Sequence, residues 1–154
     1  MTSTQLALIT APGIPAFALD ANGYLITAAA SGYSSWKSAN GTTQGIDGDH
    51  DGDGVKNGIE YFLGGPNGHT TGFTALPGVA KALDGKLSVT WIKAATYPGV
   101  YVTDFVVETS DTLGAGSWTT ETLGGPVTIT GNAVKYIFPV GPVKKFARLK
   151  VTGP

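Results

Sequence analysis

Apolar and polar residues alternate along short runs in the second half of the chain. In the first run Leu87, Val89 and Trp91 share one side, and the residues between them are Ser and Thr. A period of two is the pattern of a strand with one buried face, and turn-forming residues separate runs that recur at intervals of roughly ten residues. Six strands are therefore predicted: Lys86–Lys93, Asp104–Ser110, Trp118–Leu123, Val127–Thr130, Ala133–Phe138 and Lys145–Val151.

These strands predict a mainly β protein, an antiparallel β-sandwich of jelly-roll or immunoglobulin-like type. In the last strand Ala147, Leu149 and Val151 would face the core, and Arg148 and Lys150 would face the solvent. We expect Trp91 to fill the core, because it lies on the apolar side of its strand. On the second strand, Asp104 and Glu108 read as exposed charges.

The N-terminal region has a different pattern. From Met1 to Trp36 the only side chain charged at neutral pH is Asp20, and strand character is found at Gln5–Thr10 and Tyr24–Ala28, the latter after an Asn-Gly turn. Such a segment, here called the leader (residues 1–36), can be buried in its own domain, or it can add a strand to the sheet of another copy. The sequence leaves both uses open.

Between these regions the apolar spacing lengthens to three and four. Val55, Ile59, Phe62 and Leu63 predict one short helix, which Gly64, Gly65 and Pro66 end, while Ser34–Ala39 has the pattern of a helical turn. We therefore divide the chain into a strand region (1–32), a loop and helix (33–66), a linker (67–80) and a sandwich (81–154).

Composition narrows the classes of function. The chain has no cysteine, so disulfides and thiolate metal sites are excluded. Charged residues make up 14% and the net charge is −1, which favours neither nucleic acid nor an anionic membrane surface. Four cations near the C-terminus read as an exposed strand face: Lys144, Lys145, Arg148 and Lys150. No apolar run is long enough to insert into a membrane.

The segment DGDHDGDGVKNGIEYFLGG carries the strongest chemical signal. Oxygen-bearing residues occupy positions one, three, five, nine and twelve of an EF-hand-like calcium loop, with Gly54 at the sixth. Calcium binds six to eight hard oxygen ligands, which alternate side chains, one carbonyl and a distant bidentate carboxylate can supply. The predicted Ca²⁺ ligands are Asp49, Asp51, Asp53, the carbonyl of Val55, Asn57 and Glu60.

Two further residues of this segment, Asp47 and His50, are not predicted ligands. Asp47 lies outside the loop and is either an acceptor for the ligands or merely exposed, and His50 is expected to face solvent because calcium prefers oxygen. The plain alternative for the whole segment is a solvated acidic turn.

The loop, the segments FVVETSDTLGAGSW and KKFARLKVT, and Tyr33–Trp36 together resemble the C-terminal region of secreted bacterial proteins with autotransporter-type β-strand repeats. The loop itself is also similar to dockerin and thrombospondin-like calcium loops. The resemblance spans about Tyr33 to Thr152 and implies an extracellular or cell-surface setting, with no catalytic residues.

No nucleophile elbow, P-loop or zinc spacing is present, and the two histidines, His50 and His69, lie in an acidic loop and a Gly-rich linker. We therefore expect no enzyme but a structural protein that self-assembles into a filament or surface layer, or joins a larger surface protein, through its N-terminal region. The alternative is a carbohydrate-binding or adhesion module that recognises polysaccharide. Its candidate aromatic face is Trp91, Tyr97, Tyr101, Trp118 and Tyr136.

Overall fold

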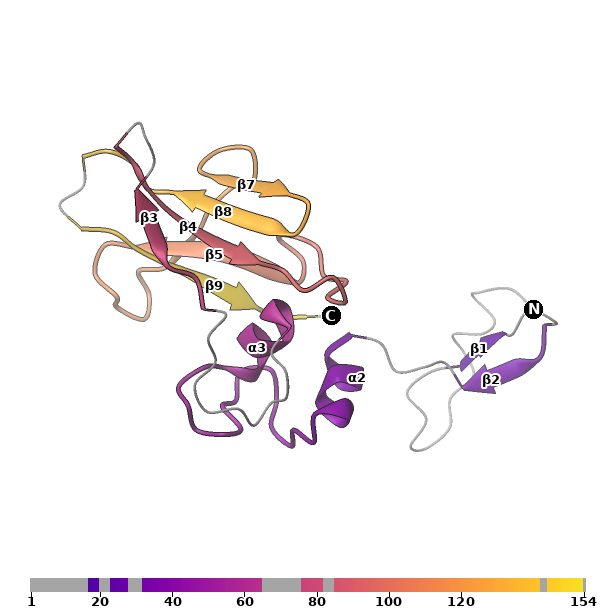
Figure 1. The fold of residues 1–154 in the computed structure, drawn as a ribbon. Coiled ribbons are helices and arrows are strands. Elements are labelled where there is room, and N and C mark those ends of the chain that lie inside the picture. Colours follow the sequence, from indigo (N-terminus) through magenta and orange to yellow (C-terminus); the bar gives the residue numbers. More distant parts are fainter. Residues whose placement is uncertain are drawn as a thin grey trace.

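A computed structural model describes residues 17–19, 23–27, 32–64, 76–81, 85–141 and 144–153. Over these residues the protein is mainly β, with two antiparallel sheets, a separate hairpin and two short helices (Figure 1). The expected strand at Gln5–Thr10, His69 and most of the predicted linker lie outside the described residues. No helix in the described part is long and apolar enough to cross a bilayer.

The first sheet has four strands, and Val89 faces Tyr136 and Trp91 faces Val134 across its centre. Its first strand begins at Val79, inside the range expected for the linker, because three exposed residues offer no alternation from which a strand can be predicted. The order across the sheet is β3 (Val79–Lys81), β4 (Leu87–Ile92), β8 (Ala133–Ile137) and β7 (Val127–Thr130).

The second sheet has three strands, ordered β6 (Thr119–Thr120), β5 (Phe105–Ser110) and β9 (Phe146–Val151). In β9 Leu149 and Val151 are buried, whereas Arg148 and Lys150 are exposed, as the alternation predicted.

Apolar side chains from both sheets meet in one core, which gives a β-sandwich-like fold. Trp91 is 6% exposed, so its predicted place in the core is confirmed. The other core residues from the two sheets are Val89, Val127, Val134 and Tyr136 on one side and Phe105, Val107, Leu149 and Val151 on the other.

The described part of the leader is a hairpin of β1 (Phe17–Leu19) and β2 (Leu25–Thr27). The second strand agrees with the prediction at Tyr24–Ala28, and the first, only three residues long, was not predicted. Figure 1 shows this hairpin lying apart from both sheets.

Two helices lie at one end of the sandwich (Figure 1), whereas the fold prediction included one. The helical turn expected at Ser34–Ala39 is extended to α2 (Gly32–Ala39), and the apolar stripe after the loop forms α3 (Asn57–Leu63). Phe62 of α3 is fully buried, with ring centroids 4.9 Å from Tyr97 and 5.0 Å from Phe105. The helix that follows the acidic loop is therefore part of the sandwich core.

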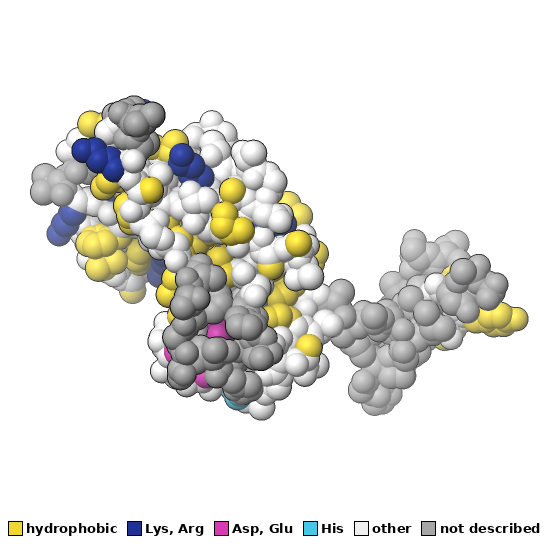
Figure 2. Space-filling model, viewed as in Figure 1, with side chains coloured by type: hydrophobic (Ala, Val, Ile, Leu, Met, Phe, Trp, Pro, Cys, Tyr) yellow, Lys and Arg dark blue, Asp and Glu magenta, His cyan; other side chains and the backbone are white. Residues whose placement is uncertain are grey.

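Charge is unevenly distributed over the surface. On the face in Figure 2, Lys and Arg side chains lie over the sandwich, and the visible Asp and Glu side chains lie at the loop end. The acidic segment is thus a local feature of one end of the molecule.

Candidate metal site

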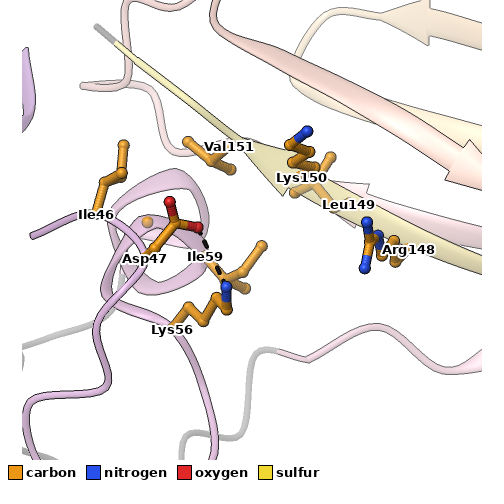
Figure 3. A pocket seen from close by; sticks show the side chains of 9 residues that line it. Ile46, Asp47, Lys56, Ile59, Arg148, Leu149, Lys150 and Val151 are labelled. Carbon is orange, nitrogen blue, oxygen red and sulfur yellow. Dashed lines mark hydrogen bonds and ion pairs between the residues drawn. The ribbon is translucent and has the colours of Figure 1, made fainter. Parts of the chain in front are cut away.

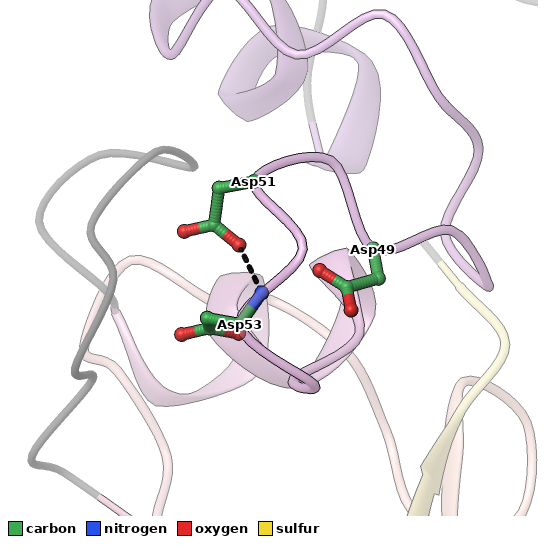
Figure 4. Close-up of side chains that lie close together, drawn as sticks. All are labelled: Asp49, Asp51 and Asp53. Carbon is green, nitrogen blue, oxygen red and sulfur yellow. Dashed lines mark hydrogen bonds between the residues drawn. The ribbon is translucent and has the colours of Figure 1, made fainter.

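Three of the predicted ligands converge in the loop. Carboxylate oxygens of Asp49, Asp51 and Asp53 all lie within 4.8 Å of one another, and each residue is partly exposed (Figure 4). This is the geometry of a cluster that can hold a metal ion, because one hard cation can contact all three groups.

The loop folds this way because each carboxylate accepts hydrogen bonds from backbone N–H groups of its own turn. The two oxygens of Asp49 accept from Gly52 (2.8 Å) and Gly54 (2.9 Å), and Asp53 accepts from Val55 at 2.7 Å. Gly54 has a φ of 92°, a left-handed conformation that glycine adopts without steric cost. The requirement for glycine at the sixth loop position therefore has a backbone cause.

One oxygen in the cluster lacks a partner. Asp51 Oδ1 accepts from the N–H of Asp53 at 3.2 Å, while its Oδ2 is buried and has no hydrogen-bond partner among the described residues. A buried oxygen anion without a partner is costly, and a bound cation removes that cost. The residues present therefore fit a hard divalent cation.

Glu60, also a predicted ligand, is not one of the three converging carboxylates; it lies in the first turn of α3 and is 2% exposed. Burial, with added repulsion from Asp51, Asp53 and Asp49, raises the pKa of Glu60 to about 7. The four carboxylates therefore interact as one electrostatic group, and their mutual repulsion would be relieved by a divalent cation.

The remaining predicted ligand side chain, Asn57, has another role in this structure. It is fully buried; its Oδ1 accepts from the N–H of His50 (3.1 Å) and its Nδ2 donates to the carbonyl of Gly45 (2.9 Å). Asn57 thus joins the start of the loop to α3. Direct or water-mediated calcium binding by Asn57, and binding by the Val55 carbonyl, stay predictions.

The side chains of Asp47 and His50, in the same segment, contact residues outside the ligand set. Asp47 is exposed and pairs with Lys56 at 3.1 Å, so its described partner is a lysine and not a ligand residue. The ring Nδ1 of His50 lies 3.4 Å from the hydroxyl of Thr43.

Sequence reasoning missed Gln44. Its amide oxygen accepts from the N–H of Asp49 (3.2 Å) and its amide nitrogen donates to the Asp49 carbonyl (3.1 Å). Gln44 thus holds the first loop residue from outside the motif, and no loop position marks it in the sequence.

Close packing connects the site to the second sheet. A Cβ on Gly58 would lie 2.7 Å from Ile46 Cγ1 and 3.4 Å from Val151 Cβ, so α3 approaches both the loop entrance and β9. The N–H of Gly58 also donates to the Ile46 carbonyl at 2.8 Å. Glycine is required here because of this close approach.

A second charged cluster lies on the second sheet, and it corrects the prediction for Glu108. Glu108 is 7% exposed, not an exposed charge: its Oε2 accepts from Arg148 Nε (2.8 Å) and Nη2 (2.7 Å). Lys150 reaches the other oxygen at 3.4 Å. The prediction was wrong because cross-strand partners on β9 bury this carboxylate, and strand period alone does not reveal them.

The proposed sugar-stacking face does not form as a surface. Trp91, Tyr97, Tyr101 and Tyr136 are all buried in the core. The remaining member, Trp118, is half-buried, and its ring stacks on the guanidinium of Arg148, whose carbon lies 3.9 Å from the ring centroid. Four of the five candidate aromatics are therefore unavailable to a polysaccharide.

Comparison of the chain with protein-family models, curated proteins and solved structures finds no match.

Proposed function

We propose that this chain is a non-enzymatic extracellular structural protein, a β-sandwich stabilised by one calcium ion. The ion would be held by Asp49, Asp51, Asp53 and Glu60, with oxygens from Val55 and Asn57 completing the set. The observation that carries the proposal is the convergence of three carboxylates on a loop whose helix, α3, is buried in the sandwich core.

The same proposal includes assembly. The subunit would associate with copies of itself in a filament or surface layer, or join a larger surface protein, through its N-terminal strand region. Support comes from the leader, which has one charged side chain in 36 residues and whose hairpin lies apart from the sheets. The extracellular setting is supported by the resemblance to secreted repeat proteins.

Calcium would stabilise the protein by binding the folded chain and not the unfolded chain. At a free concentration about 100 times the dissociation constant, this contributes roughly 2.7 kcal/mol. Glu60→Ala should therefore reduce the rise in melting temperature that millimolar calcium produces relative to chelator. Asp47→Ala is the matched control, because it removes a nearby exposed carboxylate that pairs with Lys56.

Calorimetry or a circular-dichroism melt with and without calcium measures the effect. Identical melting of the unsubstituted chain in calcium and in chelator would refute calcium stabilisation, whatever the variants do.

A further inference from the structure

We infer that the free edge of β9, with the groove between β9 and α3, is the acceptor for an extended segment from the N-terminal region of a second copy. This inference rests on the proposed assembly and names the surface that receives the strand.

The topology identifies the edge. An immunoglobulin-type sandwich has one sheet in the order A-B-E-D and another in which strand F lies between C and G. Here β3-β4-β8-β7 reproduces A-B-E-D, while β5 and β9 take the places of C and F. Within the described residues no strand pairs with β9 on the side opposite β5, which is the place of strand G.

Among the described residues, backbone groups on this side have no hydrogen-bond partner. The N–H of Thr152 donates to the carbonyl of Asp104, beside β5, at 2.8 Å, so in this register the even-numbered residues of β9 direct their backbone hydrogen bonds to β5. In an antiparallel ladder, successive residues direct their backbone N–H and C=O groups to opposite sides of the strand. The N–H and C=O groups of Ala147, Leu149 and Val151 therefore face the free edge.

A groove runs beside this edge, as Figure 3 shows. Its apolar walls are Leu149 and Val151 on β9 and Ile46 and Ile59 on the loop and α3 side, and the Asp47–Lys56 ion pair lies at its rim. Helix α3 approaches Val151 through Gly58 and so covers one end of the edge. An incoming strand would therefore pair at Ala147 and Leu149 and place an apolar side chain in the groove.

The leader has the chemistry of that occupant. Strand addition uses main-chain hydrogen bonds with apolar side chains in pockets, and Gln5–Thr10 (QLALIT) supplies apolar residues without a charge. An uncharged strand also meets no repulsion from Arg148 and Lys150, which flank the edge and are held by Glu108. The β1–β2 hairpin lies apart from the sheets, which favours donation to another molecule over closure on its own groove.

The test compares proline substitutions at two sheet edges in the full chain. Ala147→Pro removes an N–H from the free edge of β9 without removing a bond to β5, and Val79→Pro is the control on the exposed edge strand β3. Light scattering over a concentration series should show that Ala147→Pro raises the half-assembly concentration on the order of tenfold, while Val79→Pro behaves like the unsubstituted chain.

Amide hydrogen exchange on the unsubstituted chain decides the matter independently, should Ala147→Pro fail to fold. The amides of Ala147 and Leu149 should become protected only at assembling concentrations. Assembly without that protection, or unimpaired assembly of folded Ala147→Pro, overturns the β9 acceptor while leaving assembly intact. Protection in a monomer at every concentration overturns donation between copies, and a chain that never assembles refutes the proposed assembly itself.

Discussion

At Glu60 both burial and neighbouring negative charge oppose ionisation of the carboxyl group. It is buried, and three aspartates lie near it, so its pKa of about 7 is well above the ordinary glutamate value of 4.5. At neutral pH the metal-free protein therefore holds a carboxyl group that is costly to ionise. A divalent cation reverses that preference because it attracts the same charge.

The raised pKa predicts how stability depends on pH. Between about 4.5 and 7 the folded chain binds more protons at Glu60 than the unfolded chain, so in calcium-free buffer the free energy of unfolding should fall as pH rises through this window. We expect a loss of about 1 to 3 kcal/mol, the lower figure allowing for solvent screening. Urea unfolding of the unsubstituted chain and of Glu60→Gln at several pH values measures it.

Glu60→Gln should show a flatter profile over the same window, because it has no proton to lose. An unsubstituted chain whose stability rises steadily from pH 5 to pH 7 would contradict the assignment.

At the scale of the elements, the loop and α3 form one unit. The N–H of Asn57 donates to Gly48 (2.8 Å) and its side chain bonds the backbone of Gly45 and His50, so the helix start closes the loop. The loop spacing alone predicts that the side-chain oxygen of Asn57 binds the metal. In the structure both the oxygen and the nitrogen of the Asn57 amide form hydrogen bonds with backbone groups.

This difference can be tested. Asn57→Ala leaves a buried donor and acceptor without partners, so it should reduce the free energy of unfolding by about 2 to 4 kcal/mol both in calcium and in chelator. Asn40→Ala is the control and should cost less, since among the described residues the part-buried Asn40 side chain makes one hydrogen bond, to the Trp36 carbonyl (2.7 Å). Chemical denaturation under both conditions provides the comparison, and a loss confined to calcium would make Asn57 chiefly a ligand.

For the whole molecule, the main consequence is coupling between the loop and both sheets. Phe62 packs on Tyr97 and Phe105, and its carbonyl accepts from the N–H of Ala94 (2.8 Å), just after β4. Calcium at the loop would therefore stabilise the sandwich as a whole and not a peripheral turn.

Removing Phe62 should show that coupling. Phe62→Ala leaves a cavity in the shared core and should cost about 3 to 5 kcal/mol. It should also reduce the shift in melting temperature that calcium causes in the sheet signal of circular dichroism. Leu113→Ala, at an exposed position, is the control. An undiminished calcium shift in folded Phe62→Ala would mean that the sandwich does not depend on α3 for its response.

The sequence by itself determined the strands that are long enough to alternate, such as β9, and the stripe that buries Phe62, because a period of two or of three and four reports one buried face. It also determined the spacing of Asp49, Asp51 and Asp53, because the calcium-loop motif is local. Only the tertiary structure decided the burial of Glu108, the amide bonds of Asn57, the short strands β1 and β3 and the edge of β9 that no strand of the described residues pairs with. Each of these depends on which residues outside the same turn or strand come into contact on folding, and no local period records such contacts.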